Sequence, residues 1–443
     1  MAYITRSSVS RAGAKRRLVL AFLLGLGLGV AGSLSAQDVA PRRLTLADAL
    51  ALAELKGYDF LLADAAVRGA EGDLAAASRP RNPLFSGGIV HSTGVPQGDR
   101  TTSARGYTLS LADQGALEGI VSGKRSLRVQ QARAALASAR SNRDDALRLL
   151  RFQVTQAFYG VLAAEASEKA DREVAGTFAQ TFDLVGIRYR YGAVSEVDVD
   201  RVETAKLEAE QAVAGANAQV AQAKALLAFL VGGIAPDFEV SGSLEGAQPA
   251  WPSADPKDLV AEALARRPDV QAARAALDRF EAALALARRQ RLPDLILSAG
   301  YAREGPDAAP VTPPSITVGG AFELPVFNQR QGEIARAESD RAAAAIALDR
   351  VSAQATTDVL SARAALLAAR EQVERMTDRL LDRARRARDL VRLQYRAGAI
   401  SLIDLLDAER TALTVELEYQ QDLYALRTAT AQLATAVGRG VIP

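Results

Sequence analysis

Two aspartates near the C-terminus have a spacing that could give a pore its charge selectivity. Asp404 and Asp407 are three positions apart, so in a helix they lie on one face. If identical chains surround a common axis, the pair forms two rings of carboxylates, which attract cations and repel anions. The alternative is local, because the first turn of a helix favours aspartate through the helix dipole.

An earlier segment carries part of the same pattern. Residues 189–210, YRYGAVSEVDVDRVETAKLEAE, align without gaps with residues 395–416, YRAGAISLIDLLDAERTALTVE, at an offset of 206. Asp198 corresponds to Asp404, but Glu196 and Asp200 do not preserve the second carboxylate at the same spacing.

Both segments contain the residues of a tight turn between two helices. Each glycine suits the positive-φ position that ends a helix, and each serine suits the N-cap of the next helix. Turn chemistry alone would explain them, and the functional alternative is that the two tips contact a partner protein. The candidate tip residues are Gly192, Ala193, Ser195, Gly398, Ala399 and Ser401.

The composition leaves few groups for catalysis or for metal and cofactor binding. The 443 residues contain no Cys and a single His, His91, which excludes thiol catalysis, disulfides, thiolate zinc sites and lipidation of a leading Cys. His91 lies in a run with the alternation of a strand, has no partner set, and is expected to be a side chain near a loop rather than a metal ligand. No GxSxG, HExxH or P-loop motif is present, so we predict no catalytic residue, no cofactor and no enzymatic activity.

The charge balance gives no support for nucleic-acid binding. The 54 Lys and Arg residues nearly cancel the 52 Asp and Glu residues, leaving a net charge of +2. The Arg-rich stretch 382–396 is interleaved with Asp382 and Asp389, and we interpret it as a solvated or salt-bridged helix face.

The N-terminus has the pattern of a secretory signal peptide over residues 1–36. Basic residues at positions 11 and 15–17 precede an apolar run over 18–30, and small residues follow up to Ala36. Beyond residue 36 no stretch is apolar enough for a transmembrane helix. We therefore expect an exported chain.

The exported part consists of two copies of one unit. Residues 59–83 match residues 269–293 at an offset of 210, close to the offset of the first match. We place the first copy at 37–231 and the second at 257–443. The segment 232–256 joins them, with Trp251 as an expected packing anchor.

Each copy is predicted to contain a helix, two strands, a very long helix and a returning helix. Apolar periodicity and the absence of proline predict rods of about 65 residues, or about 100 Å. Rods of that length must pack lengthwise as coiled coils. The expected helices are 44–78, 124–190 and 195–231 in the first copy, and 257–291, 332–396 and 401–437 in the second.

Two alternating runs in each copy have the length of tilted membrane strands. They cover residues 84–92, 106–112, 294–303 and 315–323. Alternation alone is equally compatible with two soluble hairpins that cap a helical bundle. If the strands do span a membrane, one chain cannot close a barrel, because about eight strands are the minimum. A dimer would supply eight strands and a trimer twelve.

The order of elements, given twice, resembles the TolC-like outer-membrane efflux proteins over essentially the whole exported chain. The specific segments are the two tips at 189–199 and 395–413, ALARRPDVQAARAAL with RLPDLILSAGY, and LPVFNQRQGEIARAE. The resemblance implies a mainly α fold with a transmembrane β-barrel portion: a homotrimer with a 12-stranded barrel continued by a periplasmic α-helical barrel. It also implies docking to a periplasmic adaptor and, through it, to an inner-membrane pump of the RND type, with outer-membrane lipid around the barrel.

By the same resemblance, the aspartates at the second tip line a closed periplasmic constriction. Tyr395, and Tyr189 by repeat symmetry, become candidates for holding the tips closed; the alternative is packing in the helix seam. Ile400 stands where some relatives have a basic gating partner. The gate candidates are Asp404, Asp407, Asp198, Tyr395 and Tyr189.

RNPLFSGG, VSGKRSLR and FNQRQGEIA resemble most the CzcC/CusC heavy-metal branch of the family. The first copy departs from the family pattern at LADQGALEGIVSGKR, where a Gln-Pro and a single Gly turn would be expected. We therefore predict an exit duct of a tripartite efflux system in the outer membrane of a Gram-negative bacterium, with metal cations as cargo. Alternatives are a drug or type I secretion duct, or a periplasmic coiled-coil scaffold.

Overall fold

The computed structural model describes residues 43–97, 100–245, 255–304 and 313–440. The predicted signal peptide and Trp251 lie outside the described residues. The first copy contains β1 (Arg43–Leu44), α1 (Leu46–Lys56), α2 (Tyr58–Ser78), β2 (Leu84–Gln97), β3 (Arg100–Ala112), α3 (Ala116–Val121), α4 (Lys124–Arg190) and α5 (Glu196–Leu230). The second contains β4 (Glu239–Val240), α6 (Pro256–Arg266), α7 (Pro268–Arg289), β5 (Leu295–Glu304), β6 (Ser315–Phe322), α8 (Gln331–Arg375), the π-helix η1 (Met376–Leu381), α9 (Asp382–Arg396) and α10 (Leu402–Val437).

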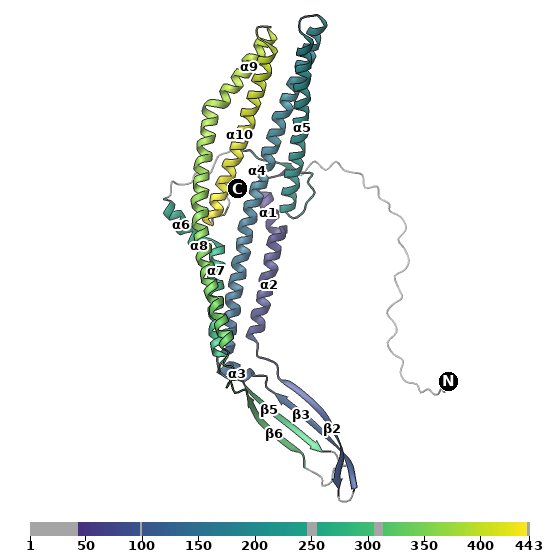
Figure 1. The fold of residues 1–443 in the computed structure, drawn as a ribbon, viewed down its shortest axis with the longest axis vertical. Coiled ribbons are helices and arrows are strands. Elements are labelled where there is room, and N and C mark those ends of the chain that lie inside the picture. The colour runs from purple at the N-terminus through teal and green to yellow at the C-terminus, as the bar shows by residue number, and fades with distance from the viewer. Residues whose placement is uncertain (1–42, 98–99, 246–254, 305–312, 441–443) are drawn as a thin grey trace, which may run out of the picture. The chain divides into compact units, whose positions relative to one another are not determined.

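The fold class predicted from the sequence is confirmed: long helices dominate, and a small portion is β-sheet (Figure 1). α4 is one continuous helix of 67 residues, about 100 Å long at 1.5 Å per residue. It runs from the short helix α3, which follows β3, to the first hairpin tip, and α5 returns along it. Among the described residues, no helix is long and apolar enough to cross a membrane.

The first helix of each copy is broken in two, contrary to the single helices expected at 44–78 and 257–291. α1 and α2 meet at Gly57, and α6 and α7 meet at Arg267, the position 210 residues later. The two residues have nearly the same extended backbone, with φ −61° and ψ 126° at Gly57 and φ −62° and ψ 126° at Arg267. Pro268 explains the second break, because a residue before proline avoids the α-helical region.

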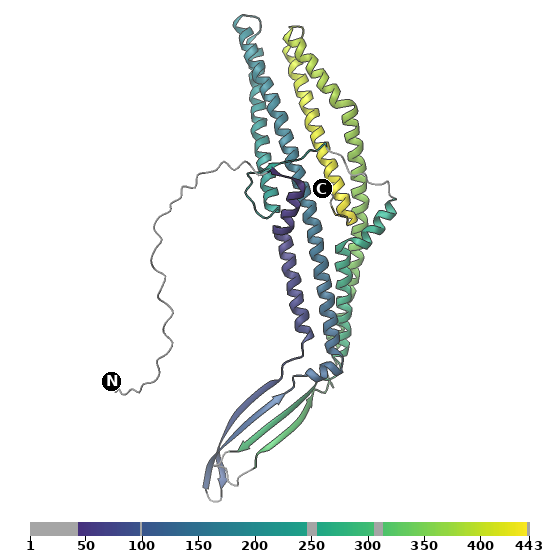
Figure 2. The ribbon, with the colours of Figure 1, turned by 180° about the vertical axis from the view of Figure 1, so that it is seen from behind.

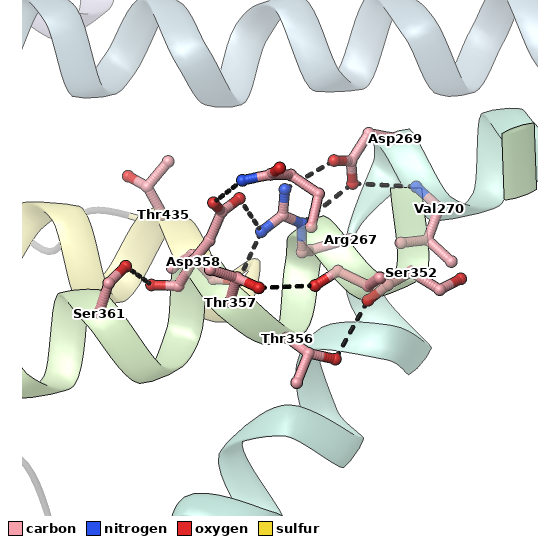
Figure 3. Close-up of polar contacts among 12 residues, drawn as sticks. Arg267, Asp269, Val270, Ser352, Thr356, Thr357, Asp358, Ser361 and Thr435 are labelled. Carbon is pink, nitrogen blue, oxygen red and sulfur yellow. Dashed lines mark hydrogen bonds and ion pairs between the residues drawn. The ribbon is translucent and has the colours of Figure 1, made fainter. Parts of the chain in front are cut away.

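At the break between α6 and α7, the buried Arg267 side chain forms a network of ion pairs (Figure 3). Its side chain donates to Asp269 at 2.7 Å and 3.1 Å and to Asp358 of α8 at 2.9 Å. It also lies 3.4 Å from the carbonyl oxygen of Ala436, near the end of α10. The residue is only 3% exposed. One guanidinium therefore joins the α6–α7 corner to α8 and α10.

The second long helix is also interrupted, although a continuous helix over 332–396 was expected. The π-helix η1 separates α8 from α9. Its ends, Met376 and Leu381, are buried with Leu244 and Tyr419. The π-helical turn alters the hydrogen-bond ladder and shifts the side chains that follow. The corresponding region of α4 contains no such turn, so the two copies differ here.

The strands form one antiparallel sheet in the order β2-β3-β5-β6, so the hairpins of the two copies pair through β3 and β5. β2 and β3 extend further toward their hairpin loop than the expected ranges 84–92 and 106–112. At the unusual segment after β3, the structure has the short helix α3 and then Gly123 at φ +75°, which precedes α4. A separate two-residue parallel pairing joins β1 to β4.

The two faces of the sheet differ in chemistry. Alternate residues along a strand point to opposite faces, and directly paired residues share a face. The strand pairing therefore assigns the exposed apolar side chains Phe85, Ile89, Tyr107, Leu109, Leu111, Leu295, Leu297, Tyr301, Ile316, Val318 and Phe322 to one face. The other face carries Ser86, Gly88, Thr108, Ser110, Ser298, Gly300, Thr317 and Gly319, with Leu84, Val90 and Ile296 as its large apolar residues.

The helices form the core by pairwise packing (Figures 1 and 2). α4 packs against α2 and α7, and α7 packs against α8. α10 packs against α4, α8 and α9. Alanine alternates with larger apolar residues in these seams, as in the buried cluster that includes Ala362, Ala369, Leu426 and Leu433. α10 has the largest buried set of any described helix.

Candidate gate at the helical hairpin tips

The two hairpin tips have the same backbone geometry. Gly192 and Gly398 end their helices at φ +69° and +76°, a region that residues with a Cβ rarely adopt. The backbone N–H of Ala193 donates to the carbonyl of Arg188 at 2.9 Å. The same bond, at the same length, recurs from Ala399 to Gln394. The expected turn chemistry of both tips is therefore present.

Each tip serine caps the returning helix together with an aspartate. Ser195 Oγ donates to Asp198 Oδ2 at 2.8 Å and accepts the Asp198 backbone N–H at 3.3 Å. Ser401 and Asp404 make the same pair of contacts at 2.7 Å and 3.3 Å. These reciprocal contacts are capping boxes. Asp198 and Asp404 thus have a structural role at the helix starts, as the helix-terminus alternative expected.

Asp404 and Asp407 lie on the exposed side of α10, while Leu402 and Leu405 are buried on the other side. Asp407 makes no hydrogen bond or ion pair with any described residue. In Asp404 the Oδ2 atom serves the cap. Both carboxylate oxygens of Asp407 and Oδ1 of Asp404 are therefore available to water or a cation.

Tyr395 lies between the two hairpins, whereas its repeat counterpart does not. Tyr395 is 5% exposed and Tyr189 is 45% exposed. The guanidinium carbon of Arg188 lies 5.1 Å from the centre of the Tyr395 ring, within cation–π range. Burial raises the pKa of the Tyr395 hydroxyl; Arg188 opposes this and the Asp198 carboxylate adds to it. The structure thus brings Tyr395 and Asp198 together but leaves Tyr189 outside.

A buried ion pair at the second tip was missed by the sequence analysis. Glu409 of α10 is 0% exposed and is held by both Nε and Nη2 of Arg392 of α9, the Nη2 contact at 2.6 Å. Arg392 Nη2 also donates to Thr177 Oγ1 of α4 at 3.2 Å. Hydrogen bonding to Glu409 raises the pKa of Arg392, which keeps it charged. The pair therefore connects the second hairpin to the first.

The repeat comparison could have pointed to this pair. Glu409 aligns with Glu203, and Arg392 aligns with Gly186. Glu203 is exposed and makes no ion pair with arginine among the described residues. The aligned pair of charges is therefore present only in the second of the two described hairpins.

An apolar cluster supports the same contact between the hairpins. Val185 and Val202 of the first hairpin are buried with Tyr395, Leu402 and Leu405 of the second. A second connection, Arg410 to Glu208 at 2.8 Å, is well exposed on both sides. Such a surface pair contributes little, so the buried contacts hold the tips together.

Replacing Gly398 with alanine tests the backbone requirement at the tip. No heavy atom lies within 4 Å of the added Cβ, so the cost is conformational and about 1–2 kcal/mol. We expect a lower thermal midpoint for the purified variant in detergent. Gly176→Ala is the matched control: its Cβ also meets nothing within 4 Å, but it lies inside α4, where alanine stabilises by about 0.5–1 kcal/mol. Equal midpoints for both variants would contradict the positive-φ role.

Among the described residues, no group of three or more His, Asp or Glu side chains is arranged to hold a metal ion. His91 lies within β2, paired with Arg105, and is exposed. It therefore lies in a strand, as its place in the expected range 84–92 indicated.

Comparisons with known proteins agree with this arrangement. The model of the outer membrane efflux protein family matches residues 50–233 and 259–439, one match in each copy. The cobalt-zinc-cadmium resistance protein CzcC of Cupriavidus metallidurans is 28% identical over 384 residues, covering 84% of this chain and 87% of CzcC. The toluene efflux pump outer membrane protein TtgC of Pseudomonas putida is 26% identical over 331 residues, covering 71% of this chain and 66% of TtgC.

Among solved structures, that of CusC, described as a transmembrane channel, superimposes with a TM-score of 0.75 at 20% sequence identity. The match covers 89% of this chain and 92% of CusC. The family match spans most of the chain, and its members are channels rather than enzymes. The chain belongs to the outer membrane efflux protein family and is a protein of the Gram-negative outer membrane with a periplasmic helical extension.

Proposed function

We propose that three copies of this chain form a passive exit duct that conducts metal cations from a periplasmic adaptor and an inner-membrane pump to the exterior. The observation that carries the proposal is the sheet, in which one face consists mostly of exposed apolar side chains, with His91, Arg105 and Arg303 toward the hairpin loops, and the other consists mostly of small and polar residues. Such a sheet suits lipid on one side and water on the other.

Assembly follows from the open edges of that sheet. β2 and β6 each have one partner in the four-stranded sheet, and an unpaired strand edge is not tolerated in lipid. Copies of the chain would satisfy these edges by pairing β6 of one with β2 of the next. Three copies give twelve strands, enough for an aqueous lumen, whereas two give eight, which side chains fill. Twelve strands therefore fit a duct.

Arginine substitutions on the two faces test which side meets lipid. Val318 is 81% exposed on the apolar face, and Thr317 is its neighbour on the polar face. Val318→Arg is expected to lower folding stability by about 2–4 kcal/mol in a bilayer. Thr317→Arg is the matched control and should have a much smaller effect. Urea unfolding in lipid vesicles measures both, and equal losses would contradict the assignment of the faces.

The tips offer a site for the adaptor. Each chain has two tips of like backbone geometry, so a trimer would present six in a pseudo-sixfold ring. Such a ring can receive a ring of adaptor subunits. The exposed Asp404 and Asp407 would then line the pore between the tips and favour cations.

The metal cargo is supported by these carboxylates and by similarity to CzcC, whose name refers to cobalt, zinc and cadmium resistance. Similarity to TtgC, named for toluene efflux, defines the rival cargo.

A susceptibility panel on a strain lacking the protein decides between the two cargoes. The strain is complemented with wild type or with Asp404→Asn/Asp407→Asn and exposed to zinc, cobalt, cadmium, copper and silver salts and to hydrophobic drugs. We expect selective metal sensitivity that wild type rescues. Sensitivity to drugs alone would contradict the metal cargo and leave the duct standing.

A further inference from the structure

A cavity of about 520 Å³ lies where the strands meet the helices, away from both tips. It is formed by α3, the starts of α4 and α8, the end of α7 and the adjacent ends of β5 and β6. Five basic side chains line it, against three acidic ones. The basic residues are Arg81, Lys124, Arg128, Arg291 and Arg330, and the acidic residues are Asp294, Glu323 and Glu333.

Only some of the basic side chains in the cavity are paired with acceptors of the protein. Lys124 Nζ donates to Asp294 Oδ1 at 2.6 Å and to the Leu292 carbonyl at 2.6 Å. Arg128 has no hydrogen-bond or ion-pair partner among the described residues, and its Nε is buried. The Arg330 guanidinium also has no partner within the described part of the chain. A buried donor without an acceptor is unfavourable, and an anionic ligand that reached it would supply the missing acceptor.

Arg330 also has an unusual backbone. It is the one described non-glycine residue with positive φ, at φ 60° and ψ 33°. It stands at the N-cap of α8, where no side chain caps the first turn. This conformation is unfavourable for a residue with a Cβ, and such strain is found preferentially at ligand sites. The free N–H groups of that turn add positive potential at the cavity.

Apolar side chains line the basic cavity on the side of the sheet. Phe322, the last residue of the apolar face, lies there with Pro293 and Pro325, and the paired residues Ile296 and Ala321 come from the other face. The next residues of the chain include Leu324 and Phe327, which are 68% and 95% exposed. The end of an apolar band marks the level of the lipid headgroups. An apolar surface next to unpaired guanidinium groups suits an amphiphile with an anionic head.

We propose that this cavity binds an anionic phospholipid of the periplasmic leaflet, with its phosphate on Arg128 and Arg330 and its acyl chains along Phe322 and Leu324. The proposal rests on the outer-membrane location of the protein but not on its cargo. The lipid phosphate would neutralise the excess positive charge of the cavity. Its acyl chains would hold the sheet at a defined depth in the membrane.

Native mass spectrometry of the detergent-purified protein tests this site with phosphatidylglycerol as the probe. We expect Arg128→Gln/Arg330→Gln to weaken retention about 25-fold, taking about fivefold for each lost cation near a lipid headgroup. Arg350→Gln is the matched control, since Arg350 is exposed on α8 and has no partner among the described residues. Arg128→Lys/Arg330→Lys keeps the charge and is expected to retain most of the lipid.

Two further measurements distinguish a lipid phosphate from free inorganic phosphate as the ligand. Zwitterionic phosphatidylcholine should bind weakly and without dependence on the two arginines, and excess inorganic phosphate should not displace phosphatidylglycerol. Equal lipid retention by wild type and the Gln double variant would overturn the proposal. So would binding of inorganic phosphate, but not of lipid, that depends on both arginines. Channel conductance is expected to be unchanged in the Gln variant, so these results are independent of the duct itself.

Discussion

Glu409→Ala is expected to raise the resting conductance of the reconstituted channel. In the present structure Glu409 is fully buried and compensates the charge of Arg392, which also contacts Thr177 of the first hairpin. Without the carboxylate, the Arg392 charge would be partly desolvated and unpaired while the hairpins stay in contact. It would regain water when the hairpins separate, so the substitution favours the separated, open tips. Breaking a buried pair costs about 3 kcal/mol or more. A bias of that size shifts the ratio of open to closed tips more than about a hundredfold.

Planar-bilayer recordings of the purified protein measure this effect. Glu203→Ala is the matched control, because Glu203 occupies the same repeat position but is exposed. Glu409→Ala/Arg392→Met removes both charges and is expected to restore part of the closed state. Wild-type conductance in a correctly assembled Glu409→Ala variant would show that the pair does not hold the tips. An equal rise in Glu203→Ala would lead to the same conclusion.

Arg267→Met is expected to cause the largest loss of stability, about 3–5 kcal/mol, because it breaks a buried ion-pair network. The substitution removes the guanidinium shared by Asp269 and Asp358, whose side chains are 23% and 35% exposed. Among the described residues, Asp269 then keeps only Arg148 as an ion-pair partner, at 3.9 Å. We expect a low yield of assembled protein and a lower thermal midpoint. Arg274→Met is the control, because Arg274 is exposed and makes a single contact with a carbonyl oxygen at 3.3 Å. Similar midpoints for the two variants would contradict the role of the network.

The same network predicts a dependence on pH. Burial acts to raise the pKa of Asp269, but Arg267 and Arg148 outweigh it, so this pKa lies below its ordinary value. A carboxylate with a lowered pKa in the folded state stabilises the protein above its ordinary pKa and ceases to do so as the pH falls through the lowered value. The stability gap between wild type and Arg267→Met should therefore be constant near neutral pH and shrink below about pH 4. A gap that is unchanged in acid would contradict this linkage.

Periodicity and turn chemistry predicted α4 and the two tips well, because these are local properties of the chain. The expected range 124–190 coincides with α4, and Ser195 and Ser401 are the N-caps that their residue types indicate. The break at Arg267 was also visible in principle, since Pro268 excludes a helical conformation for the residue before it. The break at Gly57 and the π-helix η1 depend on packing between helices distant in sequence.

The candidate gate was predicted only in part. The two tips share their backbone geometry, but their side chains make different contacts. Tyr395 and Tyr189 align in sequence, yet only Tyr395 lies between the hairpins. Arg188 and Arg392 contribute through contacts with the other hairpin, and no spacing along one helix reveals such partners. The capping role of Asp198 and Asp404 was available from the local motif.

The measurement that tests the duct most directly is the reversal potential of the purified protein in a planar bilayer under a salt gradient. We expect a conducting assembly that prefers cations, and a reduced preference in Asp404→Asn/Asp407→Asn, because the rings of exposed carboxylates are lost. Asp183→Asn, on α4 before the first tip, serves as a control for the general loss of a negative charge. Absence of conductance, or the same ion preference with and without Asp404 and Asp407, would contradict a cation-conducting duct with its selectivity at the second tip.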